Sequence, residues 1–322
     1  MCSPSGNNEL SADELARLWA RPPDPSSAGI RGQIISILLD GKLSAAQQRA
    51  KIAEATVLAV AERGQFFFDR EQRDFRSTMF FDSTRKRLEL ISGDPFHAWL
   101  SDWLRINRAD PVFAHAISEI QTVALNEKYS KGIVPEKFWA TRSGVIYVSN
   151  GDANLVKITA EGVTTSDNGT DGVLFVAGDT LSQWQFVDPK NPFQACSVFR
   201  EASFSSEHGF TLVTAWAMSL PSCPKNKPPL CFAGPVGSGK TRLAMSISEL
   251  FGAPVVANNV NKDGDGDFWV GVNAGGILIL DNCDTRVRWL ADAIAAHATG
   301  GHRDKRALYT DAQRIILRAR AW

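Results

Sequence analysis

A single eight-residue segment, GPVGSGKT at positions 234–241, constrains the fold of this 322-residue chain more than any other feature. It has the complete GxxxxGKT spacing, with an apolar run before it (LCFA, 230–233) and a helical pattern that begins near Thr241. The segment therefore predicts a strand, a glycine-rich loop and a helix, in which backbone N–H groups turn toward a phosphate. A glycine-rich turn that binds nothing is the alternative, but such a turn requires neither the lysine nor the threonine.

The side chains of this loop predict the chemistry of its ligand. Lys240 is expected to reach the β- and γ-phosphates of a nucleotide, and the Thr241 hydroxyl is expected to ligate Mg²⁺. The ligand is thus expected to be ATP, or a close relative, together with magnesium. The predicted ATP-binding positions are Gly234, Pro235, Val236, Gly237, Ser238, Gly239, Lys240 and Thr241.

A second apolar run ends in an acidic residue, as a magnesium-nucleotide site requires. Two glycines at 275 and 276 precede the run ILIL (277–280), and Asp281 follows it. The pattern predicts a buried strand whose terminal aspartate holds magnesium through a water molecule. Such a run can also be a core strand with a polar end, but its place after a complete phosphate-binding loop favours the magnesium role.

The residue after Asp281 bears on whether ATP is hydrolysed. Many ATPases of this kind place a glutamate there to activate water, whereas this chain has Asn282, and an amide does not take up a proton at neutral pH. Asp284 is the nearest carboxylate that could serve as the base, and its alternative role is the N-cap of a helix expected at 286–298. The candidate catalytic residues are therefore Lys240, Asp281 and Asp284, and hydrolysis is less firmly predicted than binding.

The overall composition limits the possible partners and compartments. Basic and acidic residues number 35 each, so no net field draws the chain to nucleic acid or membrane, and any basic surface must be local. The five cysteines contain no CxxC pair, which argues against a disulfide framework or a zinc site. The start of the chain has no secretory leader and no apolar run is long enough to span a bilayer, so a cytoplasmic protein is expected.

The remaining patterns predict a peripheral N-terminal segment, a mixed module and the nucleotide-binding core. Residues 1–29 are expected to form a short capped helix followed by the linker RPPDPSSAG. Residues 30–205 are expected to form an α+β module, and residues 206–322 the core. Within the module, helices are expected near 43–62, 95–106 and 111–129, strands at QFFFD, STMFF and KRLELIS, and a small antiparallel sheet at FWAT, GVIYVS, LVKIT and GVLFVA.

The most basic stretch of the chain follows the expected helix at 286–298. There, ALYT (307–310) and RIILR (314–318) are expected to pair as two strands joined by a turn at positions 311 and 312. Arg303, Lys305 and Arg306 cluster at its opening, and such clustering is typical of contacts with a nucleic-acid backbone. These three residues are the predicted DNA-binding residues, and an ordinary solvated hairpin is the alternative.

These motifs resemble, in type and in order, the ATPase portion of primase-helicase proteins carried by phages and mobile elements. Those proteins are relatives of the superfamily 3 helicases within the AAA+ class. The resemblance rests on GPVGSGKT, DFWV (267–270), LILDN (278–282) and ATGG followed by KRALYTD (298–311). More loosely, SDNGTDGVLF (166–175) resembles the region that precedes the ATPase, so the similarity covers roughly residues 60–322.

The resemblance implies a ring, usually of six subunits, that pulls single-stranded DNA through a pore lined by hairpins. It also implies that a strand with a polar sensor, and later an arginine finger, would follow Trp322. No polymerase-type primase domain is expected in the short N-terminal region.

The predicted fold class is therefore α/β, with an AAA+-like parallel-sheet core that is C-terminally incomplete and a smaller α+β domain before it. The predicted function is an ATP-binding, helicase-type ATPase of phage or mobile-element DNA replication, with ATP and Mg²⁺ as cofactors. A nucleotide-dependent binding module that does not hydrolyse ATP is the main alternative. A small-molecule kinase is a weaker one, because no acceptor site is recognisable.

Overall fold

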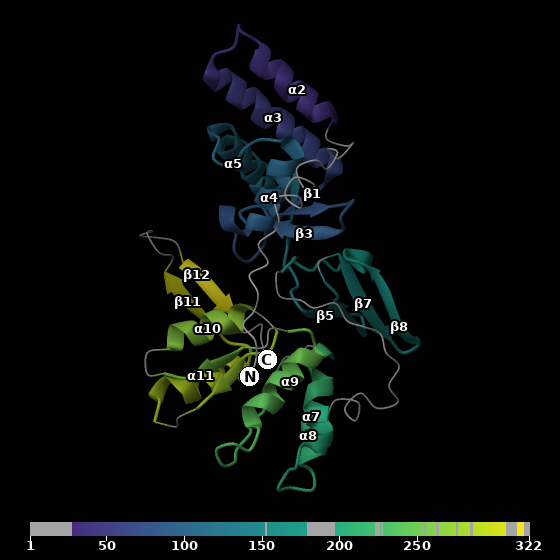
Figure 1. Cartoon of the computed structure of the whole chain (residues 1–322), viewed down its shortest axis with the longest axis vertical. Helices are drawn as coiled ribbons and strands as arrows, with labels where there is room; N and C mark the ends of the chain where they lie inside the picture. Colours follow the sequence, from purple (N-terminus) through teal and green to yellow (C-terminus); the bar gives the residue numbers. More distant parts are fainter. Residues whose placement is uncertain are drawn as a thin grey trace, which may run out of the picture. The chain divides into compact units, whose positions relative to one another are not determined.

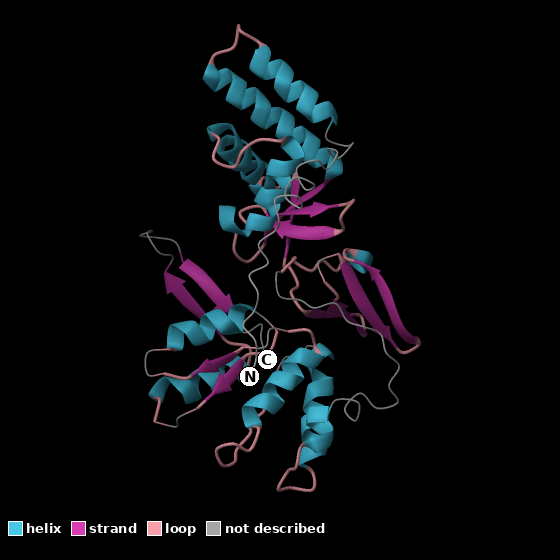
Figure 2. Cartoon of the chain, in the orientation of Figure 1, coloured by secondary structure: helices cyan, strands magenta, loops and turns pink. Residues whose placement is uncertain are grey.

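The computed structural model describes residues 28–151, 153–178, 197–222, 226, 228–253, 256–261, 264–274, 276–283, 286–306 and 314–318. These residues form a mixed α and β structure with several separate sheets (Figures 1 and 2). Contacts within the chain group them into two compact units, one from residues up to 63 with 91–123, the other from 64–90 with the residues after 123. Within the described ranges, no helix combines the length and apolar character that a bilayer-spanning segment needs.

The first unit is helical. Its helices are α2 (Ala28–Leu39), α3 (Ala45–Arg63), α4 (Asp94–Leu104) and α5 (Pro111–Leu125). The three later helices match the periodic patterns of the sequence. Four residues of α4 recur at helical spacing, and of these Phe96, Leu100 and Trp103 are buried and Trp99 is partly buried. Helix α2 was not predicted, because its run of apolar residues has no clear helical period, and it begins at two positions assigned to the linker.

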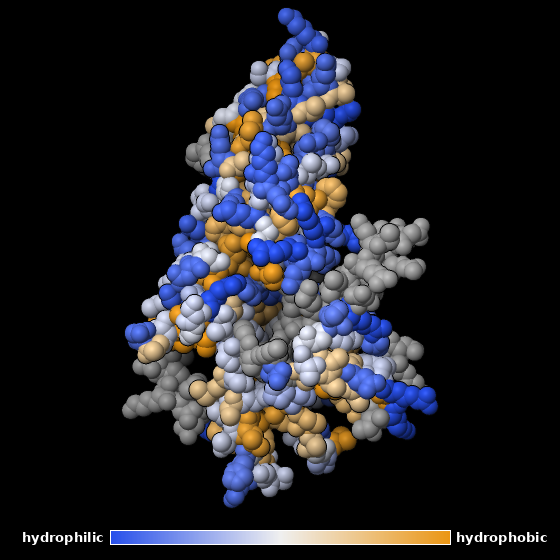
Figure 3. All heavy atoms as spheres, turned by 180° about the vertical axis from the view of Figure 1, so that it is seen from behind, coloured by the Kyte–Doolittle hydropathy of each residue, from blue (hydrophilic) through white to orange (hydrophobic). Residues whose placement is uncertain are grey.

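Apolar side chains of α2 lie both inside and outside this helical core. Ile30 and Ile34 are buried, whereas Ile35, Leu38 and Leu39 are exposed. Figure 3 shows hydrophobic residues interspersed with hydrophilic ones over the face of the chain that it displays.

The second unit contains a four-stranded sheet in the order β3-β2-β1-β4. Its strands are β1 (Gly64–Asp69), β2 (Thr78–Asp82), β3 (Arg87–Leu90) and β4 (Ser130–Ile133). The neighbours of β2 are antiparallel to it, and β4 is parallel to β1. The three predicted strands are confirmed, and Phe67, Met79 and Leu88 form a buried cluster between them.

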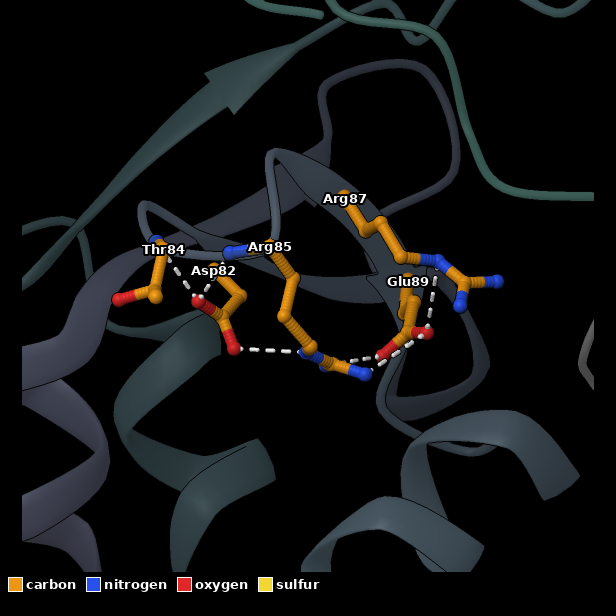
Figure 4. A network of polar contacts seen from close by, with 5 residues as sticks. All are labelled: Asp82, Thr84, Arg85, Arg87 and Glu89. Carbon is orange, nitrogen blue, oxygen red and sulfur yellow. Dashed lines mark hydrogen bonds and ion pairs between the residues drawn. The ribbon is translucent and has the colours of Figure 1, made fainter. Parts of the chain in front are cut away.

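A buried ionic network fixes the turn between β2 and β3 (Figure 4). Arg85 Nε lies 2.7 Å from Asp82 Oδ2, and Arg85 Nη2 lies 2.7 Å from Glu89 Oε2. Asp82 Oδ1 also accepts hydrogen bonds from the backbone N–H groups of Thr84 and Arg85. Both carboxylates are almost fully buried, so the arginine compensates charges that would otherwise be costly inside the fold. The network therefore has a structural role in setting the register of these strands.

A second, antiparallel sheet has the order β5-β6-β7-β8. Its strands are β5 (Trp139–Arg142), β6 (Val145–Ser149), β7 (Asn154–Thr159) and β8 (Gly162–Asp167). The small antiparallel sheet is confirmed, but its fourth strand was predicted at GVLFVA and lies instead at 162–167. Strand β8 is mostly exposed and has no apolar alternation, so its residues carry no strand signal. In the predicted segment, Phe175 and Val176 make only isolated bridges, to Glu136 and Leu88.

The region around the phosphate-binding motif alternates helices with short strands. Its elements are α7 (Ser197–Glu201), α8 (Gly209–Ser219), α9 (Lys240–Leu250), β9 (Ala257–Asn259), α10 (Asp265–Ala274), β10 (Ile279–Asp281), α11 (Arg288–Ala298), β11 (His302–Arg306) and β12 (Arg314–Arg318). One hydrophobic cluster joins α7, α8 and α9 to Trp139 of β5. A second cluster packs Phe268, Trp269 and Val272 of α10 against Ala293 of α11.

The sheet of this region is smaller than expected. Strands β9 and β10 pair in parallel, as two strands of a phosphate-binding fold should. The strand predicted at 230–233 is not formed, because no described strand pairs with this segment, and Leu230 and Phe232 instead pack against the cluster around Trp139. The described residues therefore contain a two-stranded parallel sheet here and do not confirm a larger parallel core.

The C-terminal hairpin is present with different strand limits. Strands β11 and β12 are antiparallel, with Arg306 opposite Arg314 and His302 opposite Arg318. The second strand agrees with the prediction, but its partner is 302–306 and not ALYT, which lies outside the described residues. Residues 1–27, which include the expected N-terminal helix and most of the expected linker, also lie outside them.

Candidate functional site

The loop at 234–241 has the backbone conformation that its glycines predict. Gly237 and Gly239 both have φ of 81°, in the left-handed region that residues with a Cβ rarely adopt. Helix α9 begins at Lys240, directly after the second of these glycines. The loop therefore places its backbone N–H groups beside the N-terminus of a helix, an arrangement that favours anions.

The side chain of Lys240 folds back over the loop. Its Nζ donates hydrogen bonds to the carbonyl oxygens of Gly234, at 3.0 Å, and Pro235, at 2.8 Å. Ser238 Oγ lies 3.4 Å from the same nitrogen. The ammonium group is thus held at the loop, where it supplies a positive charge next to the helix N-terminus.

Helix α9 and strand β10 bring the two predicted magnesium-binding residues together. Thr241 Oγ1 donates a hydrogen bond to Asp281 Oδ2 at 3.0 Å, although 40 positions separate them. The other carboxylate oxygen of Asp281 accepts the backbone N–H of Asn282 at 2.9 Å, which fixes the orientation of the carboxylate. A hydroxyl and a carboxylate are oxygen ligands of the kind that Mg²⁺ prefers, so these residues fit a magnesium-nucleotide complex.

A pair of amides lies at the carboxyl ends of the two parallel strands. Asn282 Nδ2 donates to Asn259 Oδ1 at 3.2 Å, and Asn282 has a left-handed backbone with φ of 52°. Asn259 was not singled out from the sequence, because only the parallel pairing of β9 with β10 shows that it lies beside Asp281 and Asn282. Asp284, the predicted alternative base, lies outside the described residues.

A thiol also lies at this end of β10. Burial raises the pKa of the Cys283 thiol, and the nearby Cys231 and Asp281 raise it further. Cys283 Sγ is 3.8 Å from the carbonyl oxygen of Leu280.

The predicted DNA-binding residues are not equivalent in the structure. Arg303 forms an ion pair with Asp265 in the first turn of α10, and both side chains are partly exposed. Lys305 and Arg306 occupy the last two positions of β11. The structure thus shows a contact within the protein for Arg303, and the side chains of Lys305 and Arg306 lie outside the part that the structure describes.

No protein-family model matches this chain. No curated protein matches it either. A function for the chain must therefore be argued from the motifs and from the geometry around Thr241 and Asp281.

Proposed function

We propose that this chain binds ATP and Mg²⁺ through an AAA+-like P-loop core and acts as a helicase-type ATPase in phage or mobile-element DNA replication. The observation that carries the proposal is the hydrogen bond between Thr241 and Asp281 beside the loop at 234–241. Many glycine-rich turns exist, but few place a helix N-terminus, a lysine, a hydroxyl and a strand-terminal carboxylate in one small region. Nucleotide binding is the part of the proposal that this geometry supports best.

In this proposal each residue has a defined role. Backbone N–H groups of the loop and the ammonium of Lys240 bind the phosphates, and Thr241 and Asp281 hold magnesium, directly or through water. Magnesium, when bound, neutralises charge on the phosphate oxygens. The loop glycines allow the backbone to approach the phosphates closely without a side chain in the way.

Coupling of ATP to single-stranded DNA, and assembly into a ring, are proposed from the resemblance of the motifs. The antiparallel hairpin at 302–318 lies where such proteins carry a DNA-contacting hairpin, and its sequence is rich in arginine. A ring of six subunits would contact DNA through six hairpins, and its affinity for DNA would therefore exceed that of a single hairpin.

A nucleotide switch that holds ATP without rapid turnover is the second candidate function. Asn282 favours this function, because its side chain is an amide that donates a hydrogen bond to a second amide, that of Asn259. Neither group takes up a proton from water at neutral pH. Both candidates require the same nucleotide site and differ only in whether hydrolysis follows.

The test is the affinity for ATP and Mg²⁺, measured by calorimetry, for the parent chain and Lys240→Ala. Removing a charged hydrogen-bond donor should weaken binding by about 10- to 100-fold. Lys42→Ala, which removes an exposed lysine between α2 and α3, is the matched control and should bind as the parent does. Equal, saturable affinity in Lys240→Ala and the parent would refute the assignment of this loop.

A further inference from the structure

Three successive residues at the start of the antiparallel β5–β8 sheet contact the elements of the nucleotide site. Lys137 and Phe138 precede strand β5, and Trp139 begins it. The carbonyl oxygen of Phe138 accepts a hydrogen bond from the backbone N–H of Ser149, and Trp139 pairs with Val148. Strand β6 therefore holds the backbone of this segment in the sheet.

The side chain of Lys137 reaches the C-terminal end of α10. Lys137 Nζ donates a hydrogen bond to the carbonyl oxygen of Asn273 at 2.9 Å, and α10 ends one residue later, at Ala274. The last carbonyl groups of a helix have no partner within the helix, and the helix dipole makes this end negative, so an ammonium group stabilises it. Lys137 thus holds the point from which the chain continues into β10, whose last residue is Asp281.

The ring of Phe138 lies against the connection between α10 and β10. A Cβ at Gly276 would lie 2.9 Å from Phe138 Cζ, and Gly276 has a φ of 76°, which residues with a Cβ rarely adopt. Phe138 and Ile277, the residue after this glycine, both pack against the hydrophobic cluster around Trp139. The connection therefore follows a path that the ring of Phe138 limits on one side.

Trp139 packs against the other element of the nucleotide site, helix α9. It is buried in one cluster with Leu243 and Ile247 of this helix. Its ring also meets the ring of Phe251, at the end of α9, with the centroids 6.1 Å apart and the planes at 81°. Thr241 lies in the first turn of the same helix, so the segment 137–139 contacts the helix of one proposed magnesium ligand and the connection that leads to the other.

We propose that Lys137, Phe138 and Trp139 are positioning residues, which hold α9 and the end of α10 so that Thr241 and Asp281 meet. This inference rests on the proposed nucleotide site, and it gives the β5–β8 sheet a role in nucleotide binding. The hydrogen bond between Thr241 and Asp281 joins α9 to β10, so a shift of one element relative to the other separates these two side chains. Magnesium demands near-ideal octahedral geometry, so its binding is sensitive to such a shift.

The test compares Lys137→Met with the parent, both as the full chain. Methionine keeps an unbranched side chain but removes the ammonium group and its hydrogen bond. Calorimetry gives the affinity for ATP with Mg²⁺ and with EDTA, and the ratio of the two affinities is the enhancement by magnesium. Lys137→Met should lower this enhancement by about 2- to 30-fold, as expected for a residue that acts on a site without touching its ligand, and should leave the affinity in EDTA unchanged.

Two further variants separate positioning from a general loss of structure. Lys131→Met is the matched control, because Lys131 is an exposed lysine on β4 of the same unit, and it should keep the parent enhancement. Lys137→Arg retains a charged donor for the carbonyl oxygen of Asn273 and should restore most of the enhancement. Partial unfolding would instead lower the number of ATP molecules bound per chain, both with Mg²⁺ and with EDTA.

A double variant tests whether Lys137 acts through the magnesium ligands. Thr241→Ala alone should reduce the enhancement, and adding Lys137→Met should then reduce it no further, whereas the effects of two independent sites would multiply. A parent enhancement in Lys137→Met, or a fall of equal size with and without Thr241→Ala, would overturn the positioning role and leave nucleotide binding intact. If the parent itself shows no enhancement by magnesium, the proposed nucleotide site fails, and this inference fails with it.

Discussion

The loop at 234–241 and the C-terminal hairpin are both short, and both were singled out from sequence. They differ in how far the sequence alone describes their geometry. In the loop, each position has a distinct requirement: Gly237 and Gly239 adopt a positive φ, Lys240 begins the helix, and Thr241 meets Asp281. In the hairpin, the signal for DNA binding was only a cluster of charges. Strand alternation then placed two members of that cluster, Arg303 and Arg306, on opposite faces. A motif with fixed spacing predicts the geometry of its residues. A cluster of charges does not, because the face on which each charged residue lies depends on the strand register.

The largest effect is expected where the nucleotide site departs from its motif. Asn282→Glu would introduce a carboxylate beside Asp281, at the position where many P-loop ATPases carry the glutamate that activates water. A positioned general base typically contributes about 100-fold or more to rate, so steady-state phosphate release should rise by about that factor over a slow parent.

Asn282→Gln is the matched control for this variant. Glutamine has the length of glutamate and meets the same left-handed backbone at position 282, where φ is 52°, but it offers no base. Its rate should remain at the parent level. Equal rates for the two variants would show that the missing base does not limit turnover, and the switch function would lose its main support.

A smaller effect is expected from changing the backbone of the loop without changing any charge. Gly239→Ala adds a Cβ that meets no atom within 4 Å, so its cost comes from the left-handed conformation alone. That cost is about 1–2 kcal/mol, and the free alanine loop avoids it by leaving this conformation. Binding must then restore the conformation, so affinity for ATP should fall about tenfold. If the alanine variant bound ATP as well as the parent, the loop conformation would not be the binding conformation.

Gly266→Ala provides the comparison for this loop variant. Gly266 lies in helix α10, has no positive φ, and has open space around it, so alanine is accommodated there. Alanine in a helix is more favourable than glycine by roughly 0.5–1 kcal/mol. ATP affinity measured by calorimetry should match that of the parent. This result would show that the loss of affinity in Gly239→Ala comes from the loop and not from replacing a glycine with alanine in general.

Sequence patterns predicted those helices and strands whose apolar residues follow a recognisable local pattern. Strands β1, β2 and β3 were found because their buried residues form short apolar runs, and α4 was found because its buried residues recur at helical spacing. The exposed strand β8 and helix α2, whose apolar residues follow no clear helical period, lack such a pattern and were missed. The segment 230–233 was predicted as a strand from its composition, but a strand also needs a partner, which composition does not reveal.

The same limit applies to the candidate site. The loop residues and Asp281 were identified from the spacing of the motif. The motif also implies that Thr241 and Asp281 lie close together, as their hydrogen bond shows. Asn259 was missed because its role depends on the pairing of β9 with β10, two strands separated by helix α10. Arg303 was predicted to contact DNA because its neighbours in sequence are basic. Its ion pair with Asp265 was not predicted, because the two residues are distant in sequence.

The most direct test of the proposed nucleotide site is the magnesium dependence of ATP affinity. Calorimetry with Mg²⁺, and again with the metal removed by EDTA, gives the factor by which magnesium strengthens binding. The parent should show a clear enhancement. Thr241→Ala and Asp281→Asn should each lose most of it while retaining metal-independent binding through Lys240, because both residues act through the metal. An enhancement in both variants equal to that of the parent would contradict the claim that Thr241 and Asp281 form the magnesium site.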